Sequence, residues 1–232
     1  MTDIDATLWC VVPAAGRGTR VGGGVAKQYL PLAGKPLLRH TMERLVAHPR
    51  VAGLMVVLAA GDAQWPDIGL LGKPVLTAIG GAERADSVLA GLRALRAKVE
   101  DGNFVLVHDA ARPCVREEDI SRLLNLGMPV GGALLAVPLR DTLKRADAQN
   151  RSVATEARDL RWRALTPQMF RYRELVAALE SARAAGIAVT DEAMAMERVG
   201  HRPLLVEGAE SNIKVTTPAD FALAEFLLER GS

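Results

Sequence analysis

Short apolar runs alternate along the chain with longer stretches in which apolar residues recur at helical spacing. The short runs contain few polar residues, which predicts strands buried on both faces of a sheet. Five such runs come first, at 8–12, 53–59, 74–79, 103–107 and 131–137, and a sixth strand is predicted at 203–206.

The stretches between these runs have the pattern of amphipathic helices. In the first, at 35–48, one face carries Leu37, Leu38, Thr41, Met42 and Leu45. The pattern returns at 84–99, after Arg116, at 172–185, at 190–199 and at 218–229, where Thr217 is a plausible cap. Strands alternating with helices predict an α/β protein whose three-layer, mostly parallel sheet is covered on both faces. Ligands of such sheets bind at the carboxyl ends of the strands.

One segment, from Arg140 to Arg163, breaks this alternation. Of its 24 residues, 11 are charged and seven of those are basic, and it lacks a long apolar face. Two interpretations are open: a solvated loop or small hairpin, or an arm that reaches a partner subunit. We expect a single domain over 1–232 with an arm at about 138–163.

Composition narrows the function classes. Among 232 residues the net charge is +2 and aromatic residues make up 4%, which argues against a nucleic-acid-binding surface. Cys10 and Cys114 lie far apart, so neither a disulfide framework nor a zinc site is expected. Acidic residues near the N-terminus do not fit a signal peptide, and no apolar run approaches the ~20 residues of a membrane span. We expect a cytoplasmic protein that does not bind membranes.

The segment "WCVVPAAGRGTRVGGGVAKQYL", at 9–30, joins a predicted strand to a glycine-rich loop. It is not a dinucleotide fingerprint, because Val21 stands where the third glycine belongs, and it lacks the P-loop spacing. Its glycines still allow backbone N–H groups to approach an anion, and Arg20 and Lys27 add positive charge. The alternative is a flexible surface turn with solvated charges.

This loop and several later segments together resemble a known enzyme family. The segments are "PAAGRGTR", "KQYLPLAGKPLL", "GGAERADSV", "HDAARP", "ALTPQMF", "TDEA" and "EGAESNIKVTTPAD". The first two are similar to the signature of sugar-phosphate nucleotidyltransferases, and the ordered set resembles the 2-C-methyl-D-erythritol 4-phosphate cytidylyltransferases. The resemblance covers about 9–229 and implies a Rossmann-like nucleotidyltransferase sheet with an extended dimerisation arm.

The resemblance also implies a reaction. CTP and 2-C-methyl-D-erythritol 4-phosphate would give 4-diphosphocytidyl-2-C-methyl-D-erythritol and pyrophosphate, in non-mevalonate isoprenoid biosynthesis. It implies Mg²⁺ as cofactor and a homodimer in which the arm completes the neighbouring site. Two positions depart from the family pattern: Ala26 replaces a usual proline, and Ala82 replaces a frequent aspartate.

Carried over residue by residue, the resemblance predicts the site. Contacts to the transition state and the leaving pyrophosphate are expected from Arg20 and Lys27. CTP is expected to contact Ala14, Ala15, Gly16, Gly18, Gly80, Gly81 and Ser87. The sugar phosphate is expected to contact Asp109, Arg112, Thr166 and Lys214, with Thr142 and Arg158 supplied by the partner's arm. Arg158 and Lys214 would orient the nucleophile, and Asp109 is also the expected Mg²⁺ ligand.

Each of these residues has a plainer interpretation on its own motif. Ser87 could be a cap or first-turn serine of a helix. Arg158 could form a surface ion pair, and Lys214 could be an exposed loop lysine. His108, beside Asp109, is expected to be structural, as is the helix start at 190–191.

The implied chemistry needs cations rather than a base. A phosphate monoester is largely dianionic at pH 7, because its second pKa is about 6, so it can attack phosphorus without a general base. Positioned cations reduce the repulsion between anions and stabilise the charge that develops. Two other functions remain open: a cytidylyltransferase for another polyol phosphate, such as ribitol 5-phosphate, and a non-catalytic nucleotide-binding module.

Overall fold

The structure, a computed structural model, describes residues 7–16, 25–65 and 72–230. Its centre is a seven-stranded sheet in the order β11-β7-β10-β6-β1-β4-β5. Every pairing in it is parallel except those of β10, which runs antiparallel to β6 and to β7. The strands are β1 (Leu8–Pro13), β4 (Val51–Leu58), β5 (Val75–Ile79), β6 (Phe104–Val107), β7 (Gly132–Pro138), β10 (Trp162–Arg171) and β11 (Leu204–Glu207). The predicted α/β, mostly parallel sheet is confirmed.

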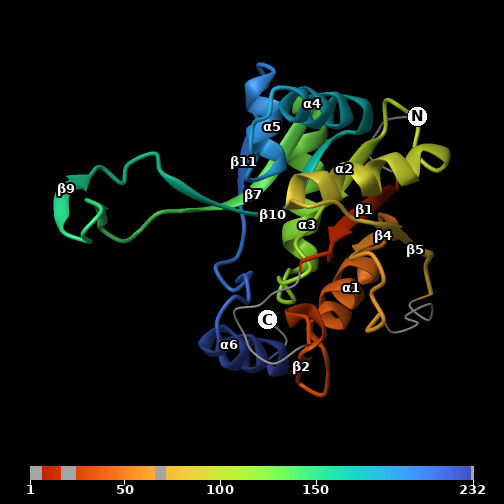
Figure 1. Cartoon of the computed structure of the whole chain (residues 1–232), viewed down its shortest axis with the longest axis horizontal. Helices are drawn as coiled ribbons and strands as arrows, with labels where there is room; N and C mark the ends of the chain where they lie inside the picture. Colours follow the sequence, from red (N-terminus) through yellow and green to blue (C-terminus); the bar gives the residue numbers. More distant parts are fainter. Residues whose placement is uncertain (1–6, 17–24, 66–71, 231–232) are drawn as a thin grey trace.

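Helices cover both faces of this sheet (Figure 1). Apolar side chains of α1 (Leu37–Ala47) and α3 (Glu117–Gly127) pack on one face, in a cluster that includes Met42 and Leu123. Side chains of α2 (Arg84–Ala94), α4 (Tyr172–Ala184) and α5 (Glu192–Arg198) pack on the other, in a cluster that includes Leu92 and Leu175. The predicted three layers are therefore present.

The last helix, α6 (Pro218–Glu229), packs against a separate small cluster that includes Val215 and Ala224. The predicted cap is confirmed, because Thr217 and Asp220 form a reciprocal capping box at its start. In the described part of the chain, no helix combines the length and the apolar character needed to cross a membrane.

Strand β10 was not predicted from the sequence. It contains Pro167, which cannot donate a ladder hydrogen bond, and the register of its pairing with β7 shifts between Ala164 and Gln168. Two polar residues of this strand, Thr166 and Gln168, are also buried. The sequence therefore lacked the apolar run that identified the other strands.

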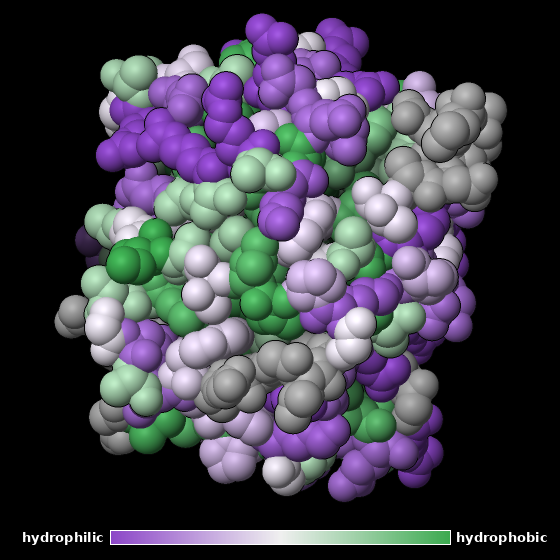
Figure 2. Space-filling model, turned by 90° about the vertical axis from the view of Figure 1, so that its right-hand side faces the viewer, coloured by the Kyte–Doolittle hydropathy of each residue, from purple (hydrophilic) through white to green (hydrophobic). Residues whose placement is uncertain are grey.

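Strand β5 differs from its prediction in burial. It forms one edge of the sheet, its side chains are only partly buried, and Ile79 is 67% exposed. Figure 2 shows this side of the molecule, where hydrophobic residues occupy the middle of the face between more hydrophilic ones. The interpretation of this run as a strand is confirmed, and its burial on both faces is wrong.

Two helices also begin or end at other residues than the sequence predicted. Residues 35–36, expected to open the first helix, form β3 (Lys35–Pro36), which pairs with β2 (Pro31–Leu32), and the helix begins at Leu37. The α-helix expected at 84–99 ends at Ala94 and continues as the 3₁₀ turn η4 (Leu95–Ala97).

The charged segment forms a hairpin that projects from the body of the protein (Figure 1). Its strands β8 (Leu143–Ala146) and β9 (Ser152–Glu156) pair antiparallel, and the Asp147 carboxylate accepts hydrogen bonds from the backbone N–H groups of Gln149 and Arg151 in the turn. The hairpin interpretation is confirmed, and the partner subunit that it would reach stays a prediction.

The fold depends on a close approach at Gly53 in β4. A Cβ atom there would lie 2.8 Å from the carbonyl oxygen of Pro74, beside β5, and 2.8 Å from the Trp9 ring. We expect Gly53→Ala to lower the free energy of unfolding by about 1–3 kcal/mol, because this backbone cannot move without disturbing the sheet edge. Urea unfolding measures it. Gly102→Ala is the matched control, since a Cβ there meets no atom within 4 Å, and an equal effect of both changes would contradict the prediction.

Candidate functional site

A cavity of about 350 Å³ opens at the carboxyl ends of β1, β5 and β6. Three chain segments line it: 13–16 after β1, 81–84 at the start of α2, and 109–111 after β6. Single side chains complete the lining, namely Lys27, Gln28, Ser87 and Lys214. The cavity lies where a parallel sheet is expected to bind its ligand.

The described part of the first loop is held by buried hydrogen bonds. The Ala14 N–H donates to the carbonyl oxygen of Val57 at 2.8 Å, so the loop starts from the end of the sheet. The side-chain amide of Gln28, 6% exposed, donates to the carbonyl oxygen of Ala14 at 2.7 Å. Gln28 therefore ties the part of the loop that contains Lys27 to the end of β1. Gly18 and Arg20 lie outside the described residues.

Two glycines allow close packing around the turn before α2, the first of them against this loop. A Cβ atom on Gly80 would lie 2.6 Å from the Cβ of Ala15 and 2.7 Å from the Ser87 hydroxyl, and one on Gly81 would lie 2.4 Å from the Cβ of Asp86. Contacts below 3 Å require a neighbour to shift, and here most of the neighbours are themselves short and fixed. Glycine at position 80 therefore lets the two walls of the cavity meet, and glycine at position 81 lets the turn pack on the start of α2.

The Ser87 hydroxyl fixes the turn that carries these glycines. It accepts a hydrogen bond from the Gly81 N–H and donates one to the carbonyl oxygen of Glu83, both at 3.2 Å. The start of α2 is further closed by a capping box between Glu83 and Asp86. Ser87 is thus a first-turn serine that also lines the cavity, so its structural interpretation and its predicted place in the site are both compatible with the geometry.

A single carboxylate, that of Asp109, organises the positive charge of the cavity. Its Oδ1 lies 3.0 Å from Nε of Arg84, and its Oδ2 lies 3.0 Å from Nζ of Lys214 and 3.3 Å from Nε of Arg112. Burial alone would raise the pKa of Asp109, but these cations outweigh it and hold the pKa well below its usual range. Asp109 is therefore ionised at neutral pH.

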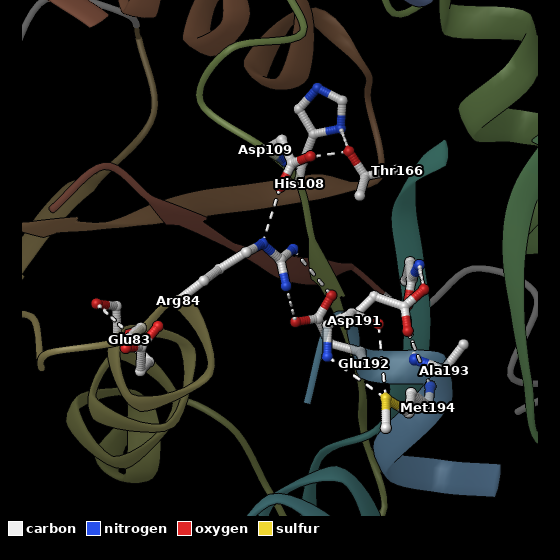
Figure 3. Close-up of polar contacts among 12 residues, drawn as sticks. Glu83, Arg84, His108, Asp109, Thr166, Asp191, Glu192, Ala193 and Met194 are labelled. Carbon is white, nitrogen blue, oxygen red and sulfur yellow. Dashed lines mark hydrogen bonds and ion pairs between the residues drawn. The ribbon is translucent and has the colours of Figure 1, made fainter. Parts of the chain in front are cut away.

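Arg84 connects this carboxylate to a second one (Figure 3). Its Nη1 and Nη2 donate to the two oxygens of Glu192 at 2.7 and 3.1 Å. Burial opposes the charge on Arg84, yet the two carboxylates keep its pKa above the usual value. Burial also opposes the charge on Glu192: it raises the pKa of this carboxyl, and the neighbouring Arg84 acts in the other direction. Neither Arg84 nor Glu192 was predicted to be a site residue, although they lie in two of the segments that carry the family resemblance, "GGAERADSV" and "TDEA".

Behind Asp109, a buried hydrogen-bond chain fixes the backbone. The Thr166 hydroxyl accepts from the Asp109 N–H at 3.1 Å and contacts Nδ1 of His108 at 3.0 Å. Nε2 of His108 lies 3.1 Å from the carbonyl oxygen of Arg112, which can only accept, so Nε2 carries the proton and Nδ1 accepts from Thr166. Burial lowers the pKa of His108 to about 4, and the ring is neutral. The structural interpretation of His108 fits this geometry.

Arg112 and Thr166 belong to the same buried hydrogen-bond network, beneath the cavity wall. Arg112, 8% exposed, donates to the Asp109 carboxylate and to the carbonyl oxygen of Asn212, and Asn212 in turn donates to the carbonyl oxygen of Thr166. The hydroxyl of Thr166 is engaged by Asp109 and His108. Direct contact of these two side chains with substrate stays a prediction.

Lys27 and Lys214 meet at one side of the cavity. Nζ of Lys27 donates to the carbonyl oxygen of Val215, at 2.5 Å, next to Lys214 in the chain. The Val215 N–H donates to the carbonyl oxygen of Ala111, so the segment before α6 is anchored to the loop that follows β6. Two lysines separated by most of the sequence therefore line one cavity, and their contacts with substrate stay a prediction.

Thr142 and Arg158 do not line this cavity. Both are exposed and belong to the projecting arm, where Nη1 of Arg158 donates to the carbonyl oxygen of Arg140. Within one chain, the arm leads away from the cavity (Figure 1).

Comparison with protein families shows to which family the chain belongs. The model of the family described as IspD, 2-C-methyl-D-erythritol 4-phosphate cytidylyltransferase, matches residues 8–230. The chain belongs to this family. The matched range includes the segments that line the cavity as well as the arm.

Individual cytidylyltransferases agree with this assignment. The 2-C-methyl-D-erythritol 4-phosphate cytidylyltransferase of Stenotrophomonas maltophilia is 59% identical over 230 residues, which cover 98% of this chain and 99% of that protein. The enzyme of that name from Xanthomonas euvesicatoria is 58% identical over 229 residues, which cover 97% of this chain and 86% of that protein. A crystal structure of the Francisella tularensis enzyme, 31% identical, superposes with a TM-score of 0.84 over 96% of this chain and 100% of the other.

The structure groups most of the residues that the family resemblance selected. Those that line the cavity are Ala14, Ala15, Gly16, Lys27, Gly81, Ser87, Asp109 and Lys214. Gly80 contacts the lining residues Ala15 and Ser87 from behind. Ala82, where the family frequently has aspartate, also lines the cavity, whereas Ala26 precedes the short turn η3 (Lys27–Tyr29).

Protonation of His108 makes stability depend on pH. Because its pKa is about 4 in the folded protein and ~6.5 in an unfolded chain, only the unfolded state binds the proton between these values. The free energy of unfolding should therefore fall by up to about 3 kcal/mol as pH is lowered from ~6.5 to ~4. The low pKa of Asp109 acts in the same direction at more acid pH.

Urea unfolding between pH ~7 and ~4.5 measures this effect. We expect His108→Gln to be less stable at neutral pH and less sensitive to acid than the parent protein. The exposed His201 provides the control His201→Gln, and His48, whose pKa burial also lowers, is present in all three proteins. An unchanged pH slope in His108→Gln would contradict the assignment.

Proposed function

We propose that this protein transfers the cytidylyl group of CTP to 2-C-methyl-D-erythritol 4-phosphate, releasing pyrophosphate, as a step of isoprenoid biosynthesis. Membership of the family supports the activity. The observation that carries the proposal in this chain is the cavity itself, in which Arg84 and Lys214 pair with the Asp109 carboxylate at the strand ends and Lys27 belongs to the same lining. Its cytoplasmic location stays a prediction.

The small-residue side of the cavity suits the nucleotide. Ala14, Ala15 and Gly16 from the first loop and Gly81 and Ser87 from the second line this part of the cavity with small side chains and backbone. Cytosine offers a donor at N4 and an acceptor at N3, which such groups can read. The close approach at Gly80 keeps this part of the cavity narrow, which favours a pyrimidine over a purine.

The charged side of the cavity suits the phosphates. An oxygen of the polyol phosphate attacks the α-phosphorus of CTP, the bond from that phosphorus to the bridging oxygen breaks, and pyrophosphate leaves. The nucleophile is already an anion, so the protein needs no base. Lys27 and, outside the described residues, Arg20 are proposed to stabilise the transition state and the leaving group. Lys214 is proposed to hold the polyol phosphate for in-line attack.

Asp109 is proposed to bind the polyol phosphate rather than a metal ion. Its two oxygens are already in contact with three cationic side chains at 3.0–3.3 Å, which would repel a divalent ion. The described residues also contain no group of three or more His, Cys, Asp or Glu side chains that could hold a metal. Mg²⁺ prefers phosphate oxygens and few protein ligands. We therefore propose that it enters as the Mg²⁺ complex of CTP, where it would reduce the charge of the triphosphate.

The arm is proposed to complete the site of a second subunit. Thr142 and Arg158 carry the groups expected to grip the polyol phosphate, but within one chain they lie away from the cavity. An exposed hairpin with basic side chains can supply them to a neighbouring cavity if the protein is a homodimer. Arg158 would then bind phosphate through its planar fork of donors.

Pyrophosphate release from CTP and Mg²⁺ tests the proposed function. 2-C-methyl-D-erythritol 4-phosphate and ribitol 5-phosphate are compared side by side. We expect turnover with the first only. Turnover with ribitol 5-phosphate alone would support the proposed use of CTP and overturn the proposed acceptor of the cytidylyl group. Binding of CTP without turnover of either would favour a nucleotide-binding module.

A mixed-dimer experiment tests the shared site. Lys27→Ala is expected to lower kcat by about 10²–10³, and Arg158→Ala to raise mainly the KM for the polyol phosphate. A purified dimer with one subunit of each kind should regain about half of the parent activity at a polyol phosphate concentration limiting for Arg158→Ala, since one of its two sites is intact.

The matched control replaces Arg158→Ala by Arg145→Ala, which removes another exposed arm cation, one that is paired with Glu156. That subunit alone should behave as the parent does. Mixed dimers that are verified by mass and only as active as the average of the Lys27→Ala and Arg158→Ala proteins would exclude the shared site.

A further inference from the structure

The Arg84 guanidinium lies between two carboxylates that come from different layers of the fold (Figure 3). Nε donates to Asp109 at the end of β6, and Nη1 and Nη2 donate to Glu192, the first residue of α5. Three of its five N–H donors are thereby directed by these two groups. Arg84 also lines the cavity, so its orientation is part of the site.

Glu192 is buried to an unusual degree for a carboxylate. It is 0% exposed, and its charge is matched by the bidentate contact with Arg84. Burying an ion pair costs a large desolvation free energy, which the attraction within the pair often only offsets. Stability alone therefore gives little reason for an ion pair here, whereas a site that needs one fixed guanidinium does.

We propose that Glu192 is a positioning residue for the polyol-phosphate half of the site: it fixes Arg84, and Arg84 fixes the Asp109 carboxylate that faces the phosphorylated polyol. This inference rests on the proposed function. Asp109 Oδ2 contacts both Lys214 and Arg112, whereas Oδ1 contacts Arg84, so Arg84 is the cation that holds the second oxygen in place. If Arg84 is free to turn, Asp109 loses one of its constraints and the polyol meets a misplaced acceptor.

The nucleotide half is held independently of Glu192. The turn at Gly81 is closed by the Ser87 hydroxyl, and the start of α2 by the capping box of Glu83 and Asp86. None of these bonds uses Arg84 or Glu192. Removing the Glu192 charge should therefore affect the polyol phosphate much more than CTP.

The helix that carries Glu192 is also held independently. The Asp191 carboxylate accepts from the Met194 N–H as a cap and from the side-chain amide of Gln168 in β10. The oxygen of the same Gln168 amide accepts from the Ala193 N–H. α5 should consequently keep its place when the Glu192 carboxylate is changed. A loss of function in a Glu192 variant can then be interpreted as a loss of the positioning of Arg84.

The first experiment compares Glu192→Gln with Glu180→Gln by steady-state pyrophosphate release. Glu180 forms the exposed ion pair with Arg93 that links α4 to the other end of α2, so it is a matched carboxylate-to-amide control. We expect Glu192→Gln to raise the KM for the polyol phosphate about tenfold and to change the KM for CTP less than about twofold. Glu180→Gln should change neither. An equal rise in both KM values, or no rise, would overturn the inference.

The second experiment is a double-mutant cycle on the same KM. If Glu192 acts through Arg84, then Glu192→Gln should have almost no further effect in an Arg84→Gln background. Independent, multiplying fold-changes would mean that Glu192 acts by another route, and would overturn the inference. The parent protein is measured alongside: if it turns over no polyol phosphate at all, the proposed function has failed instead.

Folding is controlled by the melting temperature of each variant with and without CTP. Should Glu192→Gln fail to fold, Glu192→Asp is used, because it keeps the charge but is one methylene shorter than the bidentate contact requires. It should show the same selective rise in the KM for the polyol phosphate. A parent-like KM in Glu192→Asp would contradict the need for a fixed guanidinium.

Discussion

The ionised carboxylate of Asp109 is the interaction on which the cavity depends. It draws together Arg84 from the start of α2, Arg112 from the loop after β6, and Lys214 from the segment before α6. Without a central anion, these like charges would repel one another and turn toward water. With it, Arg84 and Lys214 stay in the cavity lining and Arg112 stays behind it, so the proposed binding of a polyanion would need little reorganisation.

A second constraint is the close approach of two backbone segments. The walls of the cavity come from the loop after β1 and the turn before α2, and they meet at Gly80, where a Cβ atom would collide with Ala15. The hydrogen bonds of Gln28 and Ser87 then hold each wall to the sheet or to the helix behind it. The two constraints divide the cavity: uncharged backbone and small residues on one side, and the Asp109 cluster on the other. These are the two surroundings proposed here for the nucleotide and for the phosphorylated polyol.

The sequence predicted those parts of the fold in which local pattern and tertiary burial agree. Strands β1, β4, β6 and β7 are apolar because both of their faces are covered, and α6 begins at Pro218 because Thr217 caps it. It did not predict β10, whose Pro167 and buried polar residues contradict the usual strand pattern. The cations Lys27 and Lys214 could be selected from motifs. The pair of Arg84 and Glu192 could not, because 108 positions separate them and an acidic residue at a helix start already has a local explanation.

The arm follows from a different physical argument. A two-stranded hairpin has marginal stability in water, because it buries little apolar surface. β8 and β9 form such a hairpin, and apolar side chains on the arm, Val153 and Leu160, are exposed, as are Leu204 and Leu205 of the edge strand β11. A second copy of the chain would cover such surfaces while bringing Arg158 to its cavity. The proposed dimer would therefore stabilise the arm and supply its cation in one step. A basic hairpin with few apolar side chains of its own fits such a contact between subunits, because its charges can reach a second cavity while its exposed apolar residues are covered.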